Sequence, residues 1–272
     1  MSASQIYRLG FIGRGKLVGS VIRGLMRAKF CPPDEIIASE PNEQTRAALQ
    51  KDPGISVTAE NAEVAEKAEV IFIGVKPAMV LRVSQELSDK LQNKIVISLA
   101  GGVRIASMEK IANARFMRAL TNTPSAICQA ATAIARGSRS TSDDVDLATK
   151  IFGAIGLLVE VEEEQIDAVT GLSGSGPAFV DTVIEALAKG GTKMGLSGDV
   201  AMKLATQTVL GAAQLMIESK MSPEELREMV VTPGGTTAAG LAVMEKLGTS
   251  ESLIAAIEAA TKRGQEMAKE NS

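Results

Sequence analysis

The pattern of apolar residues changes near residue 162, and this change constrains the fold more than any other feature. Up to that point short β-rich runs alternate with helical patterns, such as the one over residues 16–28. The expected strands are 7–12, 35–38, 55–58, 69–75, 94–99, 116–119, 131–135 and 157–161. Repeated strand–helix units predict a parallel sheet covered by helices. A further helix is expected over 42–50, and Pro77 stands where another would begin.

No strand-like run follows residue 162. The expected helices there are 164–169, 177–193, 199–219, 223–229, 237–246 and 250–269. Their apolar faces are rich in Ala, Gly and Met; small residues allow close helix packing, and Met fills irregular gaps. Core filling explains the Met residues better than a cofactor role. The helices fit either a bundle within one chain or an interface of interleaved helices from two chains. The sequence thus predicts an α/β fold with an α/β domain over 1–162 and an all-α domain over 163–272.

The composition excludes several kinds of chemistry. The 272 residues include no histidine, so hydrolases with a Ser-His-Asp or Cys-His arrangement and zinc proteases are excluded, and no metal site is expected. With 29 Lys and Arg against 32 Asp and Glu, nothing indicates binding to nucleic acid or to an anionic membrane. The two cysteines form no C-x-x-C motif, which fits a reducing cytoplasm. No signal peptide is expected, nor an apolar stretch near the ~18 residues of a membrane helix.

A glycine-rich turn over residues 10–19 follows the first expected strand and opens a helix. Gly13 would allow the tight turn, and Gly15 would let the backbone approach a pyrophosphate bound at the helix N-terminus. Arg14 and Lys16 add positive charge there. The third position of the fingerprint is Val18 instead of Gly or Ala. A strand–helix turn needs glycine even without a ligand, but its place at the first βα junction favours dinucleotide binding.

Glu40 follows the second expected strand, where a dinucleotide-binding protein reads the adenosine ribose. A carboxylate there accepts both ribose hydroxyls and repels a 2′-phosphate, which favours NADH over NADPH. Ser39, Asn42 and Arg46 are nearby groups that could instead donate to a phosphate. Glu40 could also be a solvated loop charge, so the cofactor choice stays open between NADH and NADPH.

Two glycine-rich segments, 171–177 and 231–237, lie in the helical half, and each ends at an expected helix start. In the second, Gly234-Gly235-Thr236-Thr237 presents consecutive backbone N–H groups at a helix N-terminus, which suits an anion such as a carboxylate. On composition alone, two tight helix–helix turns with Ser or Thr caps are the favoured explanation of these segments.

Several motifs together resemble the pyrroline-5-carboxylate reductase family. They are Gly10-Phe-Ile-Gly13-x-Gly15, Gly74-Val75-Lys76-Pro77, Thr121-Asn122-Thr123-Pro124, Ala168-Val-Thr-Gly-Leu-Ser-Gly-Ser-Gly-Pro-Ala178 and Thr232-Pro-Gly-Gly-Thr-Thr237. They occur in family order and span nearly the whole chain. The resemblance implies an N-terminal Rossmann domain, with a doubly wound and mostly parallel sheet, and a C-terminal helical domain that binds substrate and interleaves in homodimers. Such dimers can assemble further into decamers.

The resemblance also implies the residues of the site. The implied cofactor contacts are Gly13, Gly15, Lys16, Leu17, Ser39, Glu40, Asn61, Val75, Lys76, Pro77, Ala100 and Gly101. The substrate carboxylate would lie on the backbone of Gly234, Gly235 and Thr236, and Thr237 would hydrogen-bond the ring nitrogen. Glu40 departs from the family, which often has a small hydroxyl residue there that suits NADPH.

The implied reaction is hydride transfer from NADPH or NADH to C5 of 1-pyrroline-5-carboxylate, which gives L-proline. The nearest rivals are a β-hydroxyacid dehydrogenase and a general imine reductase of similar architecture. Hydroxyacid dehydrogenases of that type use a Lys at the start of the helix after the glycine-rich segment, but here Lys189 and Lys193 come too late. A non-catalytic dinucleotide-binding regulator would explain the first glycine turn but not residues 232–237.

Overall fold

The computed structural model describes residues 5–13, 15–44, 46–47 and 54–271. The chain divides into two compact units, one of Met1–Ser175 with Glu258–Ser272 and the other of Gly176–Ile257. Arg14, and with it the charge expected beside a pyrophosphate, lies outside the described residues, as does part of the helix expected over 42–50.

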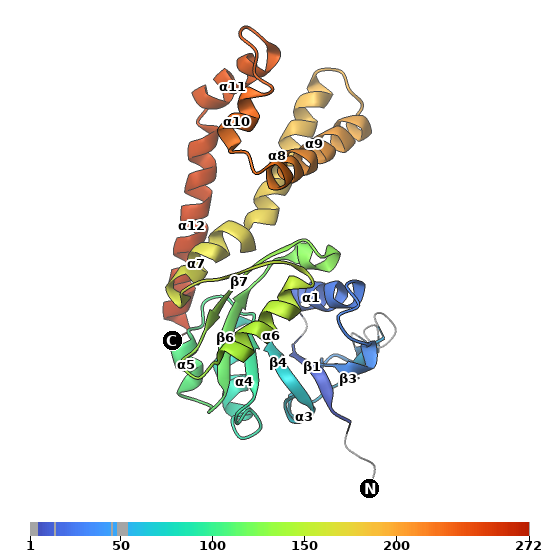
Figure 1. Ribbon diagram of the computed structural model, residues 1–272, viewed down its shortest axis with the longest axis vertical. Helices are drawn as coiled ribbons and strands as arrows, with labels where there is room; N and C mark the ends of the chain where they lie inside the picture. Colours follow the sequence, from blue (N-terminus) through green and yellow to red (C-terminus); the bar gives the residue numbers. More distant parts are fainter. Residues whose placement is uncertain (1–4, 14, 45, 48–53, 272) are drawn as a thin grey trace. The chain divides into compact units, whose positions relative to one another are not determined.

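The first unit contains an eight-stranded sheet in the order β3-β2-β1-β4-β5-β6-β7-β8 (Figure 1). The strands are β1 Tyr7–Ile12, β2 Ile36–Ser39, β3 Ser56–Thr58, β4 Ala68–Ile73, β5 Ile95–Ser98, β6 Arg115–Leu120, β7 Ala130–Arg136 and β8 Gly156–Glu160. Each strand expected from the sequence is present, with its ends shifted by a few residues at most. The strand order reverses between β1 and β4, and this switch point is where doubly wound proteins bind their ligands.

The sheet is parallel from β3 to β6, but β7 runs antiparallel to β6 and parallel to β8. The connection between β6 and β7 explains the reversal. It contains only the short 3₁₀ helix η2 (Thr123–Ile127), whereas parallel neighbours need a crossover of a dozen or more residues. The sheet is therefore mostly parallel, as the resemblance implied, rather than fully parallel.

Helices cover both faces of the sheet. One hydrophobic core lies between the strands and the helices α1 (Lys16–Arg27) and α6 (Ser142–Gly153). The other lies beneath α3 (Asn61–Lys67), α4 (Pro77–Glu86) and α5 (Ile105–Glu109). Pro77 is the first residue of α4, as its missing N–H predicts. This two-sided cover explains why the central strands read as continuous apolar runs.

The chain leaves the sheet through the 3₁₀ helix η3 (Glu163–Gln165) and α7 (Ile166–Val169). Here the structure differs from the expected glycine-rich turn. Residues Thr170–Gly174 form a π-helical turn, in which the Ser175 N–H donates to the Thr170 carbonyl at 2.9 Å. The segment between α7 and the next helix is therefore helical. Single π-helical turns are frequent at functional sites.

The second unit contains α8 (Gly176–Lys193), α9 (Gly198–Ser219), α10 (Pro223–Glu228), α11 (Thr236–Lys246) and the beginning of α12 (Thr249–Glu270). Its buried apolar cluster is small and consists of Ala188, Ala201 and Ala205. Large side chains on these helices remain exposed in the single chain; Leu204 and Leu210 are each 55% exposed. Because helices with so little buried surface are not stable alone, this unit needs apolar cover from elsewhere.

One helix in the described part of the chain, α9, is long and apolar enough to cross a membrane, with a mean hydropathy of 1.3. The expectation that no apolar stretch approaches this length is therefore wrong on length and composition. The reason is that Ala, Gly, Leu and Met dominate α9 without forming one unbroken run. A single such helix is weak support for a membrane segment, since core helices of soluble proteins meet the same criteria.

Candidate functional site

The glycine turn after β1 has the geometry that a pyrophosphate needs. Gly13 has φ +84°, and a Cβ there would lie 2.7 Å from Val75 Cγ1, so this position requires glycine. Gly15 precedes α1 as its N-cap, and no side chain of the described residues caps the helix. Among those residues, a Cβ on Gly15 would meet only the Gly74 carbonyl, at 4.0 Å. The exposed backbone at Gly15 and Lys16 thus leaves first-turn N–H groups of α1 free for an anion.

Val18 does not weaken the turn, because other glycines provide the close packing. Val18 is fully buried, and a Cβ on Gly74 would lie 2.1 Å from its Cγ2. Gly74 follows β4 and thereby makes room for the larger side chain. Farther along α1, a Cβ on Gly24 would lie 2.1 Å from the Ser125 carbonyl. Gly74 and Gly24 thus set how closely α1 approaches the sheet and η2, which the fingerprint alone did not reveal.

The adenosine end of the expected site is formed by β2 and α3. Ser39 is fully buried at the end of β2, and its hydroxyl donates to Asn61 Oδ1 at 2.7 Å. Asn61 is the first residue of α3. The fold therefore brings together two expected cofactor residues that are 22 positions apart. Since the Ser39 hydroxyl already donates to Asn61, it is not a free donor for a phosphate in this conformation.

The loop after β2 holds Glu40 in place. Its backbone N–H donates to the Thr58 carbonyl at 2.9 Å, and its Oε1 accepts from the Asn42 N–H at 2.9 Å. Arg46 Nη1 donates to the carbonyls of Glu40 and Pro41 at 2.8 and 2.7 Å. Glu40 is partly exposed at the carboxyl edge of the sheet, while Arg46 donates to backbone acceptors.

The remaining expected cofactor residues lie at the same edge of the sheet. Val75, Lys76 and Pro77 follow β4 and open α4. Ala100 and Gly101 follow β5, where the Leu99 N–H donates to the Ile73 carbonyl at 2.9 Å. Leu17 is partly buried in the first turn of α1. The fold therefore gathers the expected cofactor residues at the carboxyl ends of β1, β2, β4 and β5, together with the start of α3.

The motif Thr121–Pro124 and the glycine-rich segment 171–177 are joined by a hydrogen bond that the sequence did not reveal. Asn122 is 7% exposed; its Nδ2 donates to the Ser173 carbonyl at 3.1 Å, and its Oδ1 accepts from the Ala131 N–H at 3.1 Å. Asn122 and Ser173 are 51 residues apart, and no local pattern signals such a pair. The contact ties the segment after β6 to the π-helical turn.

The Gly234–Thr237 segment lies in the second unit. Gly234 has φ +71°, and Gly235 is the N-cap of α11. The Gly235 N–H donates to the Thr232 carbonyl at 2.9 Å, which closes the turn. Within the described residues no side chain caps α11 and no acceptor is found for the Thr236 N–H. The first-turn N–H of Thr236 is therefore available to an anion such as a carboxylate.

A mostly parallel sheet with a glycine turn at its switch point defines a Rossmann-type dinucleotide-binding protein. Comparison with known proteins agrees with this class. Residues 8–102 match the family model "NADP oxidoreductase coenzyme F420-dependent", and residues 163–267 match "Pyrroline-5-carboxylate reductase dimerisation". The pyrroline-5-carboxylate reductase of Pisum sativum is 40% identical over 97% of this chain and 97% of its own length. The chain belongs to the pyrroline-5-carboxylate reductase family.

Solved structures give the same assignment. A pyrroline-5-carboxylate reductase from Coxiella burnetii is 34% identical, with a TM-score of 0.88 over 97% of this chain and 99% of the other. The Plasmodium falciparum pyrroline carboxylate reductase, solved with NADP bound, is 27% identical, with a TM-score of 0.89 over 98% of this chain and all of the other. The expected fold, an N-terminal Rossmann part and a helical C-terminal part, is confirmed.

Proposed function

We propose that this protein reduces 1-pyrroline-5-carboxylate to L-proline by hydride transfer from NADPH or NADH, the last step of proline biosynthesis. The observation that carries the proposal is the 40% identity to a pyrroline-5-carboxylate reductase over nearly the full length of both chains. The free first-turn N–H groups at α1 and α11 add support, because they suit a pyrophosphate and a carboxylate.

The cofactor is held by the carboxyl edge of the sheet. Gly13, Gly15, Lys16 and Leu17 contact the pyrophosphate at the start of α1, and Ser39, Glu40 and Asn61 surround the adenosine ribose. Val75, Lys76 and Pro77, then Ala100 and Gly101, line the rest of the site. The open space at Gly15 and the uncapped α1 fit such a molecule. Glu40 favours NADH, since its carboxylate repels a 2′-phosphate.

The substrate carboxylate lies on the backbone of Gly234, Gly235 and Thr236. The Gly235 N–H is used to close the turn, so Gly235 shapes the carboxylate site rather than donating to it with this N–H. Thr237 is in the first turn of α11, and its hydroxyl hydrogen-bonds the ring nitrogen. We assign Thr237 as the catalytic residue on this basis.

The chemistry asks little of the side chains. When bound, the reduced nicotinamide supplies a hydride to C5 of the imine. A protonated imine is already a strong electrophile, so holding the ring in place supplies much of the rate. Thr237 orients the nitrogen, but a hydroxyl is a poor acid at neutral pH. The proton therefore comes from solvent or from an imine that binds already protonated, which agrees with a chain that contains no histidine.

The protein acts as an oligomer with a small-molecule substrate. We propose a homodimer in which the exposed apolar helices of the second unit cover one another, and a decamer as a further assembly. The functional boundary lies at residue 162, with cofactor binding in 1–162 and substrate binding and dimerisation in 163–272. The matched dimerisation model begins at residue 163. The site of action is the cytoplasm, without membrane or nucleic-acid partners.

One assay tests the function. Purified protein should oxidise NADPH or NADH with pyrroline-5-carboxylate and should not reduce NAD(P)⁺ with a β-hydroxyacid. Turnover of a hydroxyacid would support the dehydrogenase alternative, which the relatives do not favour. Reduction of many cyclic imines at equal rates would indicate a general imine reductase. Dinucleotide binding without any turnover would indicate a regulator.

A further inference from the structure

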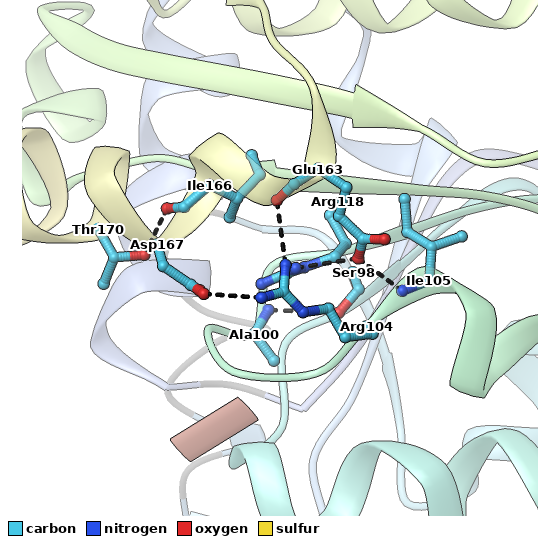
Figure 2. Close-up of polar contacts among 9 residues, drawn as sticks. All are labelled: Ser98, Ala100, Arg104, Ile105, Arg118, Glu163, Ile166, Asp167 and Thr170. Atoms are coloured by element: carbon cyan, nitrogen blue, oxygen red, sulfur yellow. Dashed lines mark hydrogen bonds and ion pairs between the residues drawn. The ribbon is translucent and has the colours of Figure 1, made fainter. Parts of the chain in front are cut away.

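A cluster of four charged residues, Arg104, Arg118, Glu163 and Asp167, lies beside the loop after β5 (Figure 2). Arg104 ends this loop, Arg118 is on β6, and the two carboxylates are on η3 and α7. None of them belongs to the proposed cofactor or substrate contacts. We call this set the charge cluster.

Glu163 is the centre of the charge cluster. Its Oε1 accepts from the Ile105 backbone N–H at 2.7 Å and from Arg118 Nη1 at 3.0 Å. Its own carbonyl accepts from Arg104 Nη1 at 3.3 Å. Glu163 therefore caps the first turn of α5 from a position 58 residues away, while an arginine holds its carboxylate. Arg118 and the Ile105 N–H together fix the direction of that carboxylate.

Arg118 is almost fully buried, with 1% of its side chain exposed, and Glu163 is 19% exposed. Burial lowers the pKa of the Arg118 guanidinium, and the hydrogen bond to Glu163 opposes this shift. A guanidinium nevertheless stays charged in proteins. A buried charge is strongly destabilising unless it is paired. The ion pair with Glu163 is therefore what makes a charged side chain tolerable at this buried position of β6.

Asp167 holds the other side of the loop. Its Oδ2 accepts from Arg104 Nη2 at 3.0 Å, and its side chain is only 1% exposed. The end of α12 completes the enclosure, because a Cβ on Gly102 would lie 2.8 Å from Met267 Cβ. Gly102 has φ +66° and so could not easily be another residue. The loop is thereby fixed at its middle and at its end.

The loop held in this way contains Ala100 and Gly101, which are proposed cofactor contacts. The order of the strands in the sheet indicates which half of the cofactor Ala100 and Gly101 contact. Adenosine lies over β1 and β2, on one side of the switch point, so the nicotinamide half lies over β4 and β5. The loop after β5 therefore lies against the nicotinamide half.

We propose that the charge cluster is a positioning device for the nicotinamide half of the cofactor, acting through the loop after β5. This inference rests on the proposed function, because it takes the ligand to be NADH or NADPH. It adds four positioning residues, none of which touches the cofactor, and it assigns a role to the segment after residue 162 in holding the cofactor loop.

The test compares NADH with ADP-ribose, which has the same adenosine half but no nicotinamide. Dissociation constants are measured by fluorescence or calorimetry for wild type and for Glu163→Gln and Glu163→Asp. Glu163→Asp keeps the charge opposite Arg118 but is too short to hold both partners. In each variant we expect NADH binding to weaken about tenfold, ADP-ribose binding to stay within about twofold, and kcat to fall with an unchanged KM for the imine.

Asp144→Asn is the matched control. Asp144 is also a buried carboxylate that pairs with an arginine of β6, Arg115, at 3.5 Å. It also accepts a backbone N–H, that of Thr141, at the start of a helix. Asp144→Asn should destabilise the protein without changing the ratio of the two dissociation constants. The proposal would be overturned if both Glu163 variants kept the wild-type ratio of the dissociation constants for NADH and ADP-ribose, whether binding of the two ligands stayed the same or weakened equally. Wild type that binds NADH but does not reduce pyrroline-5-carboxylate would overturn the proposed function alone.

Discussion

Gly13 and Gly54 have nearly the same backbone conformation, so substitutions at the two positions distinguish the effect of backbone strain from that of steric contact. Gly13 has φ +84° and Gly54 has φ +83°, but among the described residues only Gly13 of the two has a neighbour, Val75, within 4 Å of an added Cβ. Both substitutions to Ala pay the strain of a left-handed residue, about 1–3 kcal/mol. Gly13→Ala should lower stability further and abolish NAD(P)H binding, whereas Gly54→Ala should keep binding. Thermal unfolding and nucleotide titration check this; equal effects of the two variants would contradict the close approach at Gly13.

Thr237 is predicted to act through its hydroxyl. Thr237→Ala removes a hydrogen bond to the ring nitrogen, so kcat/KM for pyrroline-5-carboxylate should fall about tenfold. Thr237→Ser keeps the hydroxyl and should retain most activity, while the Kd for NADH should be unchanged in both. Steady-state kinetics and nucleotide titration make the measurement. Full kcat and KM in Thr237→Ala would remove this role.

Glu40 is predicted to set the cofactor preference. Glu40→Ser removes the charge that repels a 2′-phosphate, so the ratio of kcat/KM for NADPH to that for NADH should rise about tenfold, or ~1.4 kcal/mol. Glu43→Ser removes an exposed carboxylate three residues later and is the control. Kinetics with both cofactors decide the matter, and an unchanged ratio in Glu40→Ser would exclude Glu40 as the determinant.

At the scale of elements, the sequence predicted the strands well and the helices of the first unit less well. Buried parallel strands are continuous apolar runs that stand out in any window. Helices α3, α5 and α6 were not predicted, because α3 and α5 are short. For α6 there was a usable signal, the capping box formed by Thr141 and Asp144. The π-helical turn was missed because a glycine-rich run is more often a loop.

The packing of α1 on the sheet gives a prediction at this scale. Gly74→Ala would drive a methyl group into Val18 Cγ2, at 2.1 Å, and overpacking of this kind costs about 1–3 kcal/mol. Val18→Ala removes that methyl and leaves a cavity, so it also destabilises. The double variant should be more stable than the sum of the two single losses predicts. Urea unfolding of the four proteins gives the coupling energy, and strict additivity would show that the two residues do not meet.

At the scale of the whole molecule, the second unit is the part whose large apolar side chains a single chain leaves exposed. Leu204 is 55% exposed on α9, and a charge there should weaken the proposed dimer. Leu204→Glu should shift the protein toward monomer in sedimentation or light scattering at micromolar concentration. Met79→Glu places the same charge on α4 of the first unit, where 44% of Met79 is exposed, and should leave the assembly unchanged. An unaltered mass for Leu204→Glu would exclude this face of α9 from the interface.

The sequence by itself determined the α/β class, all eight strands, the glycine turn, and the family, because these depend on local periodicity and on long motifs. Only the tertiary structure decided the antiparallel direction of β7, the Ser39–Asn61 and Asn122–Ser173 contacts, and the cap that Glu163 provides for α5. Each joins segments whose partners are set by the path of the chain through the sheet. Side-chain chemistry can be read from neighbouring positions, but a contact across 58 residues exists only after the fold has brought its two ends together.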